Sequence, residues 1–441
     1  MMSADYSLDF AKYHAAVESV KPIRLQGKVT QVVGLVIEGY CPDTSIGAIC
    51  EIRPQGGGAI PAEVVGFRNN KTLLMPLGEI RGVGLDSLIS VRRDKASMGV
   101  GPGMLGRVID GLGNPIDGKG PLIVECEYPI YAAPVNPMTR PPIRKPLDLG
   151  IRSINGLLTC GQGQRVGIMA GSGVGKSTLL GMIARYTEAD VNVIALIGER
   201  GRELREFIEK DLQEEGLKKS VVVVATSDQP PLVRMRGAYI ATTIAEYFQK
   251  QGKKVLLMMD SATRFAMAMR EVGLAIGEPP TTKGYTPSVF AALPKLLERA
   301  GNFSEGSITG LYTVLVEGDD FNEPISDAMR SILDGHIVLS RGLASRNVYP
   351  PIDVLASASR VMNDVTSVEQ QQLAGKFKET MATYNQSEDL INIGAYKAGT
   401  NPGIDYAVAR IEGMTSYLKQ AVHDPVTMQE AHQDLKQIFD A

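Results

Sequence analysis

One short segment has the residues and the spacing of a phosphate-binding loop, Ala170-Gly-Ser-Gly-Val-Gly-Lys-Ser-Thr178. An apolar run at 165–169 precedes it and a helical pattern at 179–184 follows it. A strand, a glycine-rich turn and a helix form the context that such a P-loop requires, because backbone N–H groups and the helix N-terminus then face the phosphates. The residues expected to bind a nucleotide are Gly171, Ser172, Gly173, Val174, Gly175, Lys176, Ser177 and Thr178.

Two residues of this loop have distinct chemical roles. Lys176 is expected to reach the β- and γ-phosphates of ATP, and the Ser177 hydroxyl is expected to ligate Mg²⁺. The consensus loop begins with Gly, whereas Ala170 stands at that position here. The adjoining Gly171 and the intact Gly-Lys-Ser favour a working loop over a glycine turn with no ligand.

Two carboxylates directly follow apolar runs that read as buried strands. Asp260 ends the run that starts at Val255, and Glu199 follows the run at 191–197. Because the carboxyl ends of parallel strands meet at one edge of a sheet, both carboxylates are expected beside the P-loop. Asp260 is predicted to hold Mg²⁺ together with Ser177, and Glu199 to orient or deprotonate the attacking water. The alternative for Glu199 is a solvated loop of mixed charge.

Three different patterns along the chain predict the architecture. Short β-rich runs at 29–36, 48–52, 64–67, 73–75 and 88–91 predict a small β-barrel. Apolar runs that alternate with helical stretches predict an α/β core, a parallel sheet with helices on both faces. With the P-loop, this core resembles the RecA-like fold. Helical patterns at 369–384 and 402–419 predict a C-terminal helical domain. The predicted domains are an N-terminal helix at 1–22, the barrel at 23–96, the P-loop ATPase domain at 97–362 and the helical domain at 363–441.

Composition excludes several classes of protein. Hydrophobic residues make up 44% of the chain and charged residues 22%, which is typical of a folded globular protein. A net charge of -3 disfavours a nucleic-acid partner. The four cysteines form no CxxC pair, so neither a zinc site nor a disulfide framework is indicated. No secretory signal or membrane-spanning stretch is predicted.

Several further segments resemble the catalytic subunits of rotary ATPases. They are Gly198-Glu-Arg-Gly-Arg-Glu203, Asp260-Ser-Ala-Thr-Arg-Phe265, Gly277-Glu-Pro-Pro280, Val316-Glu-Gly-Asp-Asp320 and Pro350-Pro-Ile-Asp-Val-Leu-Ala-Ser-Ala-Ser-Arg360. The resemblance implies that Glu199 is the catalytic base, that Arg200 and Arg264 line the phosphate pocket, and that Tyr349 stacks on the adenine. It also implies that Arg360 is an arginine finger that reaches the nucleotide of a neighbouring subunit; the alternative is a surface arginine that opens the C-terminal domain.

Within that group the chain is similar to the ATPases of flagellar and virulence type III protein export, and the flagellar branch is preferred. The segments that carry this similarity are 105–117, 169–176, 284–290 and 332–341. The resemblance implies a homohexameric ATP-hydrolysing motor in the cytoplasm, peripheral at the inner face of the cytoplasmic membrane. It implies a stator-like regulatory protein bound at the N-terminal helix. Further implied partners are an export gate, a central stalk protein, export chaperones and export substrates.

Two other functions compete with this interpretation. A hexameric RNA translocase would need a basic groove with stacking aromatic residues in the barrel, where Tyr40 and Phe67 are the only aromatics at hand. A ring component that binds nucleotide only for structure would be expected to lack the base, so Glu199 argues against it. The leading hypothesis predicts Mg²⁺-dependent hydrolysis that rises with subunit concentration.

Overall fold

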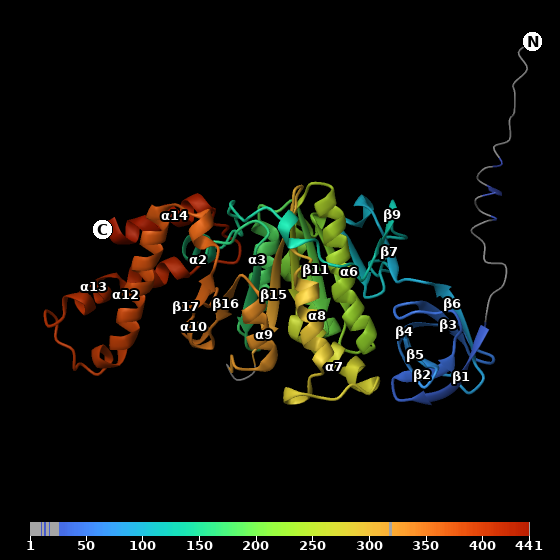
Figure 1. Cartoon of the computed structure of the whole chain (residues 1–441). Helices are drawn as coiled ribbons and strands as arrows, with labels where there is room; N and C mark the ends of the chain where they lie inside the picture. Colours follow the sequence, from blue (N-terminus) through green and yellow to red (C-terminus); the bar gives the residue numbers. More distant parts are fainter. Residues whose placement is uncertain (1–9, 11–12, 15–16, 18–25, 317–319, 441) are drawn as a thin grey trace, which may run out of the picture. The chain divides into compact units, whose positions relative to one another are not determined.

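The computed structural model describes residues 10, 13–14, 17, 26–316 and 320–440 (Figure 1). The chain divides into two compact units, Met1–Ala96 and Ser97–Ala441. The helix predicted at 1–22 falls almost entirely on residues outside the described part, so it stays a prediction. Among the described residues, no helix has both the length and the apolar character that crossing a membrane requires.

The first unit contains a closed antiparallel barrel with the strand order β1-β2-β5-β4-β3-β6. The strands are β1 (Gln26–Val33), β2 (Val36–Tyr40), β3 (Ile49–Arg53), β4 (Ile60–Arg68), β5 (Lys71–Pro76) and β6 (Leu88–Arg93). Inward-facing side chains such as Ile37, Ile52, Leu74 and Ile89 are fully buried and form the barrel core. The predicted small β-barrel is confirmed.

The apolar run at 29–36 is two strands and not the single strand that its composition suggested. Val33 ends β1 and pairs with Val36, the first residue of β2, across a two-residue turn. Val33 and Leu35 are 55% and 42% exposed, so apolar residues sit at the turn itself. The turn is Gly34-Leu35, and Gly34, with a φ of +57°, is the residue that marks the break between the two strands.

The second unit is built on a mainly parallel sheet, as predicted. Its strand order is β17-β16-β10-β15-β13-β11-β12-β8, and β14 pairs with β15. The strands are β8 (Arg107–Asp110), β10 (Arg165–Ala170), β11 (Val191–Ile197), β12 (Ser220–Ala225), β13 (Lys254–Asp260), β14 (Gly301–Asn302), β15 (Ser307–Leu315), β16 (Gly335–Leu339) and β17 (Ile352–Ser359). A separate ribbon pairs β7 (Ser97–Val100) with β9 (Cys126–Pro129).

The direction of each strand decides which residues meet at which edge of this sheet. From β8 to β16 along the order the neighbours are parallel, so their carboxyl ends lie at one edge. β17 is antiparallel to β16, and its last residue, Ser359, pairs with Gly335 at the start of β16. The chain therefore leaves β17 at the opposite edge of the sheet.

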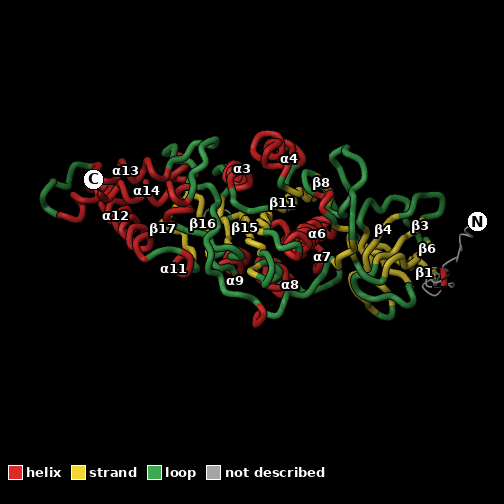
Figure 2. The backbone as a smooth tube through the Cα atoms, turned by 90° about the horizontal axis from the view of Figure 1, so that it is seen from above, coloured by secondary structure: helices red, strands yellow, loops and turns green. Residues whose placement is uncertain are grey.

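Helices cover both faces of the sheet (Figure 2). α3 and α4 lie on one side of the strands in this view, and α6, α8 and α9 lie on the other. The helices are α2 (Arg152–Leu157), α3 (Lys176–Tyr186), α4 (Gly201–Glu206), α5 (Gln213–Lys218), α6 (Pro231–Lys250), α7 (Ala262–Ala275), α8 (Pro287–Leu297), α9 (Pro324–Ile332) and α10 (Arg341–Ser345). A π-helical turn, η3 (Phe207–Leu212), joins α4 to α5 and packs on α3.

Helices alone follow the sheet, as predicted. They are α11 (Met362–Val365), α12 (Val368–Asn392), α13 (Pro402–Leu418) and α14 (Met428–Asp440). Both α12 and α13 begin at side-chain caps, where Ser367 accepts from the N–H of Gln370 and Asn401 accepts from that of Gly403. Phe377 and Tyr417 pack together with ring centroids 5.6 Å apart. These helices also contact α2 and β17, so they belong to the same compact unit as the sheet.

Candidate active site

The P-loop lies between β10 and α3, at the carboxyl edge of the sheet. Gly173 and Gly175 have φ angles of +77° and +90°, which favour glycine, and Gly175 caps the start of α3. These conformations turn the backbone around the space in front of the helix N-terminus, where the partial positive charge of α3 favours an anion. The loop therefore has the local geometry that phosphate binding requires.

The Ala170 departure from the consensus has a simple structural explanation. Ala170 is the last residue of β10, is 1% exposed, and pairs with Leu315 on one side and Leu339 on the other. A methyl group is compatible with this strand position. The positive φ angles fall later in the loop, at residues that are glycine in this chain.

Lys176 lies between the two predicted carboxylates. Its ammonium is 2.5 Å from Oδ1 of Asp260 and 3.7 Å from Oε1 of Glu199. The Thr313 hydroxyl on β15 donates to the same Asp260 oxygen at 2.6 Å. β13 and β15 are neighbours in the sheet, which explains how Asp260 and Thr313 meet. The two carboxylates and the P-loop lysine thus form one contiguous charged cluster.

Glu199 follows β11 at the same edge and is only partly exposed. Burial raises the pKa of its carboxyl group to about 7. The Lys176 ammonium lowers this pKa, whereas the Asp260 carboxylate raises it. A carboxyl group with a pKa near neutral pH can accept a proton efficiently, so the environment of Glu199 suits a general base.

Arg264 and Arg200 approach the cluster differently. A β-carbon on Gly198 would lie 3.0 Å from Cβ of Arg264, so the Arg264 side chain runs directly over that glycine. Nε of Arg264 is buried and has no hydrogen-bond partner among the described residues, as expected of a donor that awaits an anion. The Arg200 side chain is 80% exposed and lies 3.5 Å from Glu203.

A cavity of about 630 Å³ joins these groups in front of the P-loop. The predicted residues that line it are Gly171, Ser172, Gly173, Gly175, Lys176, Ser177, Thr178, Glu199, Arg200 and Arg264. Val174 and Asp260 do not line the cavity: Val174 is buried, and Asp260 contacts the cavity residue Lys176. The cavity is large enough for a bound phosphate chain and its ribose.

The sequence did not single out several residues that line this cavity. They are Glu203, Glu206, Asp211, Leu315, Val316 and Arg341. Arg341 lies two residues after the end of β16, as Glu199 lies two residues after the end of β11, so the rule that found Glu199 would also have found it. Asp211 lies on η3, and only the tertiary packing of η3 against α3 brings it here.

Tyr349 lies next to the P-loop although it is far from it in sequence. Two ring carbons of Tyr349 are 3.8 Å from the position that a β-carbon on Gly175 would occupy. The ring is 45% exposed, and the Tyr349 carbonyl accepts a hydrogen bond of 2.8 Å from the N–H of Gln420. An exposed ring beside a phosphate loop can stack on a nucleotide base.

Arg360 is not part of this cavity. It follows Ser359, the last residue of β17, and its N–H donates to the Asp334 carbonyl at 3.0 Å. This position is at the amino end of β16, the opposite edge of the sheet from the P-loop of the same chain. Arg360 is exposed there, so it is available to another molecule.

The residues at the P-loop fit Mg²⁺ together with a nucleotide. Mg²⁺ is usually held by one or two protein oxygens, substrate phosphates and water. Ser177 is exposed at the start of α3. The Asp260 carboxylate contacts Lys176, the residue before Ser177. This donor set matches that requirement, and the buried Arg264 Nε supplies a place for phosphate charge.

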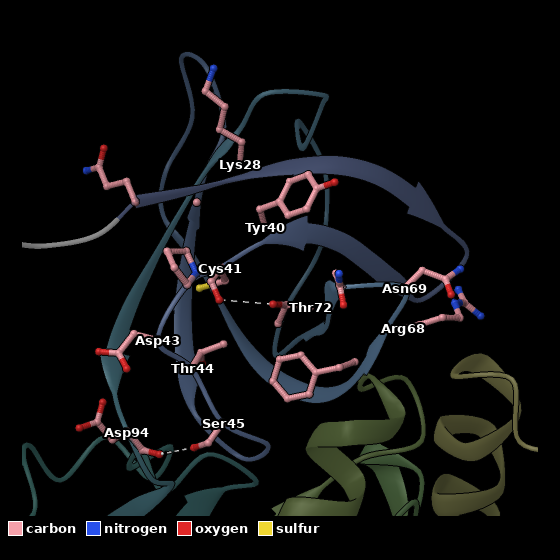
Figure 3. Close-up of a pocket in the computed structure, with 15 residues that line it drawn as sticks. Lys28, Tyr40, Cys41, Asp43, Thr44, Ser45, Arg68, Asn69, Thr72 and Asp94 are labelled. Atoms are coloured by element: carbon pink, nitrogen blue, oxygen red, sulfur yellow. Dashed lines mark hydrogen bonds between the residues drawn. The ribbon is translucent and has the colours of Figure 1, made fainter.

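A second cavity, of about 1200 Å³, lies in the barrel unit (Figure 3). Tyr40 and Phe67, the two aromatic residues considered for RNA stacking, both line it. The lining cations Lys28 and Arg68 each lie near a carboxylate, at 3.4 and 2.5 Å, and two aspartates also line the cavity. Its charge is balanced, so it does not resemble the positive groove of a single-strand binder.

The fold and this site define a P-loop ATPase of the RecA-like class. The family model for the ATP synthase alpha/beta family, nucleotide-binding domain, matches residues 150–359. The model for the T3SS EscN ATPase C-terminal domain matches residues 366–437.

Individual proteins are similar over most of the chain. The flagellum-specific ATP synthase of Bacillus subtilis (strain 168) is 54% identical, with 94% of this chain and 95% of that protein covered. The type 3 secretion system ATPase of Xanthomonas euvesicatoria is 50% identical, with 90% of each covered. Two structures of the assembled ATPase EscN from enteropathogenic E. coli, one in complex with its central stalk EscO, are 46% identical and have TM-scores of 0.88 and 0.87. Each covers 93% of this chain and 99% of the EscN chain.

The chain therefore belongs to the ATP synthase alpha/beta family, in the group of flagellum-specific ATP synthases and type 3 secretion system ATPases. This confirms the prediction of an ATP-hydrolysing enzyme of type III protein export, and the RNA translocase alternative gains no support.

Proposed function

We propose that this chain is the ATP-hydrolysing motor of a flagellar type III export apparatus, which uses hydrolysis to deliver and unfold export substrates. The observation that carries the proposal is the division of the catalytic groups between two edges of one sheet. Lys176, Glu199 and Asp260 lie at the P-loop edge, and Arg360 lies at the other. Two copies that meet head to tail would join these edges into one site.

A ring of six identical subunits follows from this proposal. A head-to-tail contact is heterologous, and such contacts close into rings when the rotation between copies permits. Support comes from EscN, which was solved as an assembled ATPase and as a complex with its central stalk. We extend both to this chain: six copies around a central stalk protein.

Each site residue has a proposed task. The Lys176 ammonium exchanges the Asp260 carboxylate for the β- and γ-phosphates of ATP, and the N–H groups of the loop hold the phosphate chain. Ser177 and Asp260 would hold Mg²⁺, which when bound supplies charge neutralisation at the phosphates. Tyr349 stacks on the adenine. Arg200 and Arg264 bind phosphate oxygens at the mouth and the floor of the cavity.

Hydrolysis itself requires Glu199 and Arg360. The Glu199 carboxylate orients the attacking water and takes its proton, a task for which its raised pKa of about 7 is suited. Arg360 of the neighbouring copy stabilises charge on the γ-phosphate, a contribution typically worth about 10³ to 10⁵ in rate. Hydrolysis then depends on assembly.

The remaining proposals concern architecture, partners and location. We propose the four domains 1–22, 23–96, 97–362 and 363–441, with a stator-like regulatory protein bound at the first. Export gate, chaperones and export substrates are the other proposed partners. The proposed location is the cytoplasm, at the inner face of the cytoplasmic membrane. The relatives named flagellum-specific favour the flagellar branch.

The substitution Glu199→Gln tests the enzymatic part. It removes the proton acceptor and keeps the shape, so phosphate release should fall by about 10²-fold or more while ATP still binds. The measurement is phosphate release beside the binding of a fluorescent ATP analogue, each with Mg²⁺ and with EDTA. Retained hydrolysis in the variant, or hydrolysis in EDTA equal to that with Mg²⁺, would contradict the assigned roles.

A further inference from the structure

Two hydrogen bonds hold Arg360 in place, although the residue is exposed. Its N–H donates to the Asp334 carbonyl at 3.0 Å, and its guanidinium donates to the Arg330 carbonyl at 3.1 Å. Both acceptors lie at the α9–β16 junction, one on the last turn of α9 and the other immediately before β16. The direction of the guanidinium therefore depends on where this junction sits.

Asp334 is in turn clamped to the first residue of β10. Its Oδ2 accepts from the Arg165 N–H at 3.1 Å and from Arg165 Nε at 2.9 Å, and its Oδ1 accepts from Arg165 Nη2 at 3.1 Å. The Asp334 N–H donates back to the Arg165 carbonyl at 2.8 Å. Charge-assisted hydrogen bonds to both carboxylate oxygens fix orientation as well as distance.

A fully buried glutamine ties the same two elements to the end of β17. Nε2 of Gln164 donates to the Asp334 carbonyl at 2.9 Å and to the Ser359 hydroxyl at 3.2 Å, and Oε1 accepts from the Gly161 N–H at 2.8 Å. The Ser359 hydroxyl donates onward to the Thr159 carbonyl at 2.8 Å. Ser359 is the residue before Arg360, so the chain is held at the residue that precedes the finger.

The strand that carries this clamp leads directly into the P-loop. β10 starts at Arg165 and ends at Ala170, and it pairs with β15 on one side and β16 on the other. A strand held between two neighbours is a stiff element. The contacts that hold Arg360 therefore lie at one end of β10, and the phosphate loop begins at the other end.

We propose that Asp334, together with Gln164 and Arg165, is a positioning residue that sets Arg360 for the nucleotide site of the neighbouring subunit. The clamp acts in the subunit that supplies Arg360. It does not change ATP binding at the P-loop of that same subunit. The inference rests on the proposed function, because it requires that Arg360 act on a neighbour's nucleotide. No residue of the clamp touches the nucleotide cavity of its own chain.

The substitution Asp334→Asn tests the clamp. It removes one of the two carboxylate charges that hold Arg165, the other being Glu298. A finger displaced by about 1 Å should lower hydrolysis about 10²-fold. Binding of a fluorescent ATP analogue should not change. Asp327→Asn is the matched control, since Asp327 is an exposed carboxylate on α9 outside the clamp, and it should hydrolyse ATP like the unchanged chain.

Mixed rings separate positioning from a general structural defect. In a mixture of Asp334→Asn with Glu199→Gln, the Asp334→Asn copies supply intact P-loops and the other copies supply well-placed fingers, so hydrolysis should return. In a mixture of Asp334→Asn with Arg360→Ala, only Asp334→Asn copies have a finger, so hydrolysis should stay low. Hydrolysis that returns in the second mixture, or stays low in the first, overturns the inference.

A control mixture and a substitute variant complete the experiment. The mixture of Glu199→Gln with Arg360→Ala must itself hydrolyse ATP; if it does not, the trans-acting finger of the proposed function falls, and the inference falls with it. If Asp334→Asn does not fold, Ser359→Ala replaces it, because that change removes one hydrogen bond of Gln164 next to the finger. The same two mixtures then apply, with an expected loss of about tenfold in the homomeric protein.

Discussion

Glu199 shares its surroundings with charges that act on its pKa in opposite directions. Burial raises this pKa most, the Lys176 ammonium lowers it, and the Asp260 carboxylate raises it again. The lysine is much closer to Asp260 than to Glu199, at 2.5 Å against 3.7 Å. The ammonium therefore offsets only part of the effect of burial on Glu199, whose pKa stays near 7.

The titration of Glu199 should appear in the pH dependence of hydrolysis. The pKa of about 7 is above that of an ordinary glutamate, and the carboxylate is the active form. kcat/KM should therefore fall about tenfold for each pH unit below 7 and level off above it. The control is the ATP affinity of Glu199→Gln over the same range, which reports titration of the substrate alone. A corrected profile that stays flat from about pH 5 to 8 would exclude Glu199 as the titrating base.

At the scale of elements, short connections bring the site together. The turn after β11 carries Gly198 and Glu199, and the start of α7 carries Arg264, whose side chain crosses Gly198. Gly198 has a φ of +71°, and its N–H donates to the Ala225 carbonyl at 2.6 Å. Because Arg264 packs on this turn, the proposed base Glu199 and the proposed phosphate-binding residue Arg264 are positioned by the same few atoms.

The substitution Gly198→Ala tests this connection. A β-carbon would meet Cβ of Arg264 at 3.0 Å and force a left-handed backbone on alanine, a strain of about 1–2 kcal/mol. Displacement of Arg264 and Glu199 should lower kcat about tenfold. Gly201→Ala is the matched control, because a β-carbon at Gly201 would have no neighbour within 4 Å. Equal activity of the two variants would show that the turn does not position the site.

The sequence predicted those parts of the site that follow from strand ends. Glu199, Asp260 and the P-loop come directly after apolar runs, and parallel pairing brings such residues to one edge. Asp211 and Asp334 have no such signal, because their places depend on how η3 packs on α3 and how β16 pairs with β10. The turn in the run at 29–36 was also missed, although Gly34 at its first position is a turn residue with a φ of +57°.

In the whole molecule, the sheet places the proposed catalytic groups at two opposite edges, although hydrolysis would need them in one site. Lys176 and Glu199 lie at the carboxyl edge of the parallel strands. Arg360 lies at the opposite edge, where the end of β17 pairs with the start of β16. A single copy therefore has a nucleotide cavity that lacks the proposed arginine finger. Coupling hydrolysis to assembly in this way would restrict ATP turnover to rings, which suits the proposed export motor.

Subunit mixing tests whether Arg360 acts on the nucleotide site of a neighbouring subunit. Rings of Glu199→Gln alone and rings of Arg360→Ala alone should each be inactive. In an equal random mixture, about a quarter of the head-to-tail contacts join an intact Glu199 to an intact Arg360. Hydrolysis in the mixture should return to as much as that fraction of the unchanged protein's rate. A mixture that stays as inactive as its two components would contradict the account, as would full hydrolysis by Arg360→Ala alone.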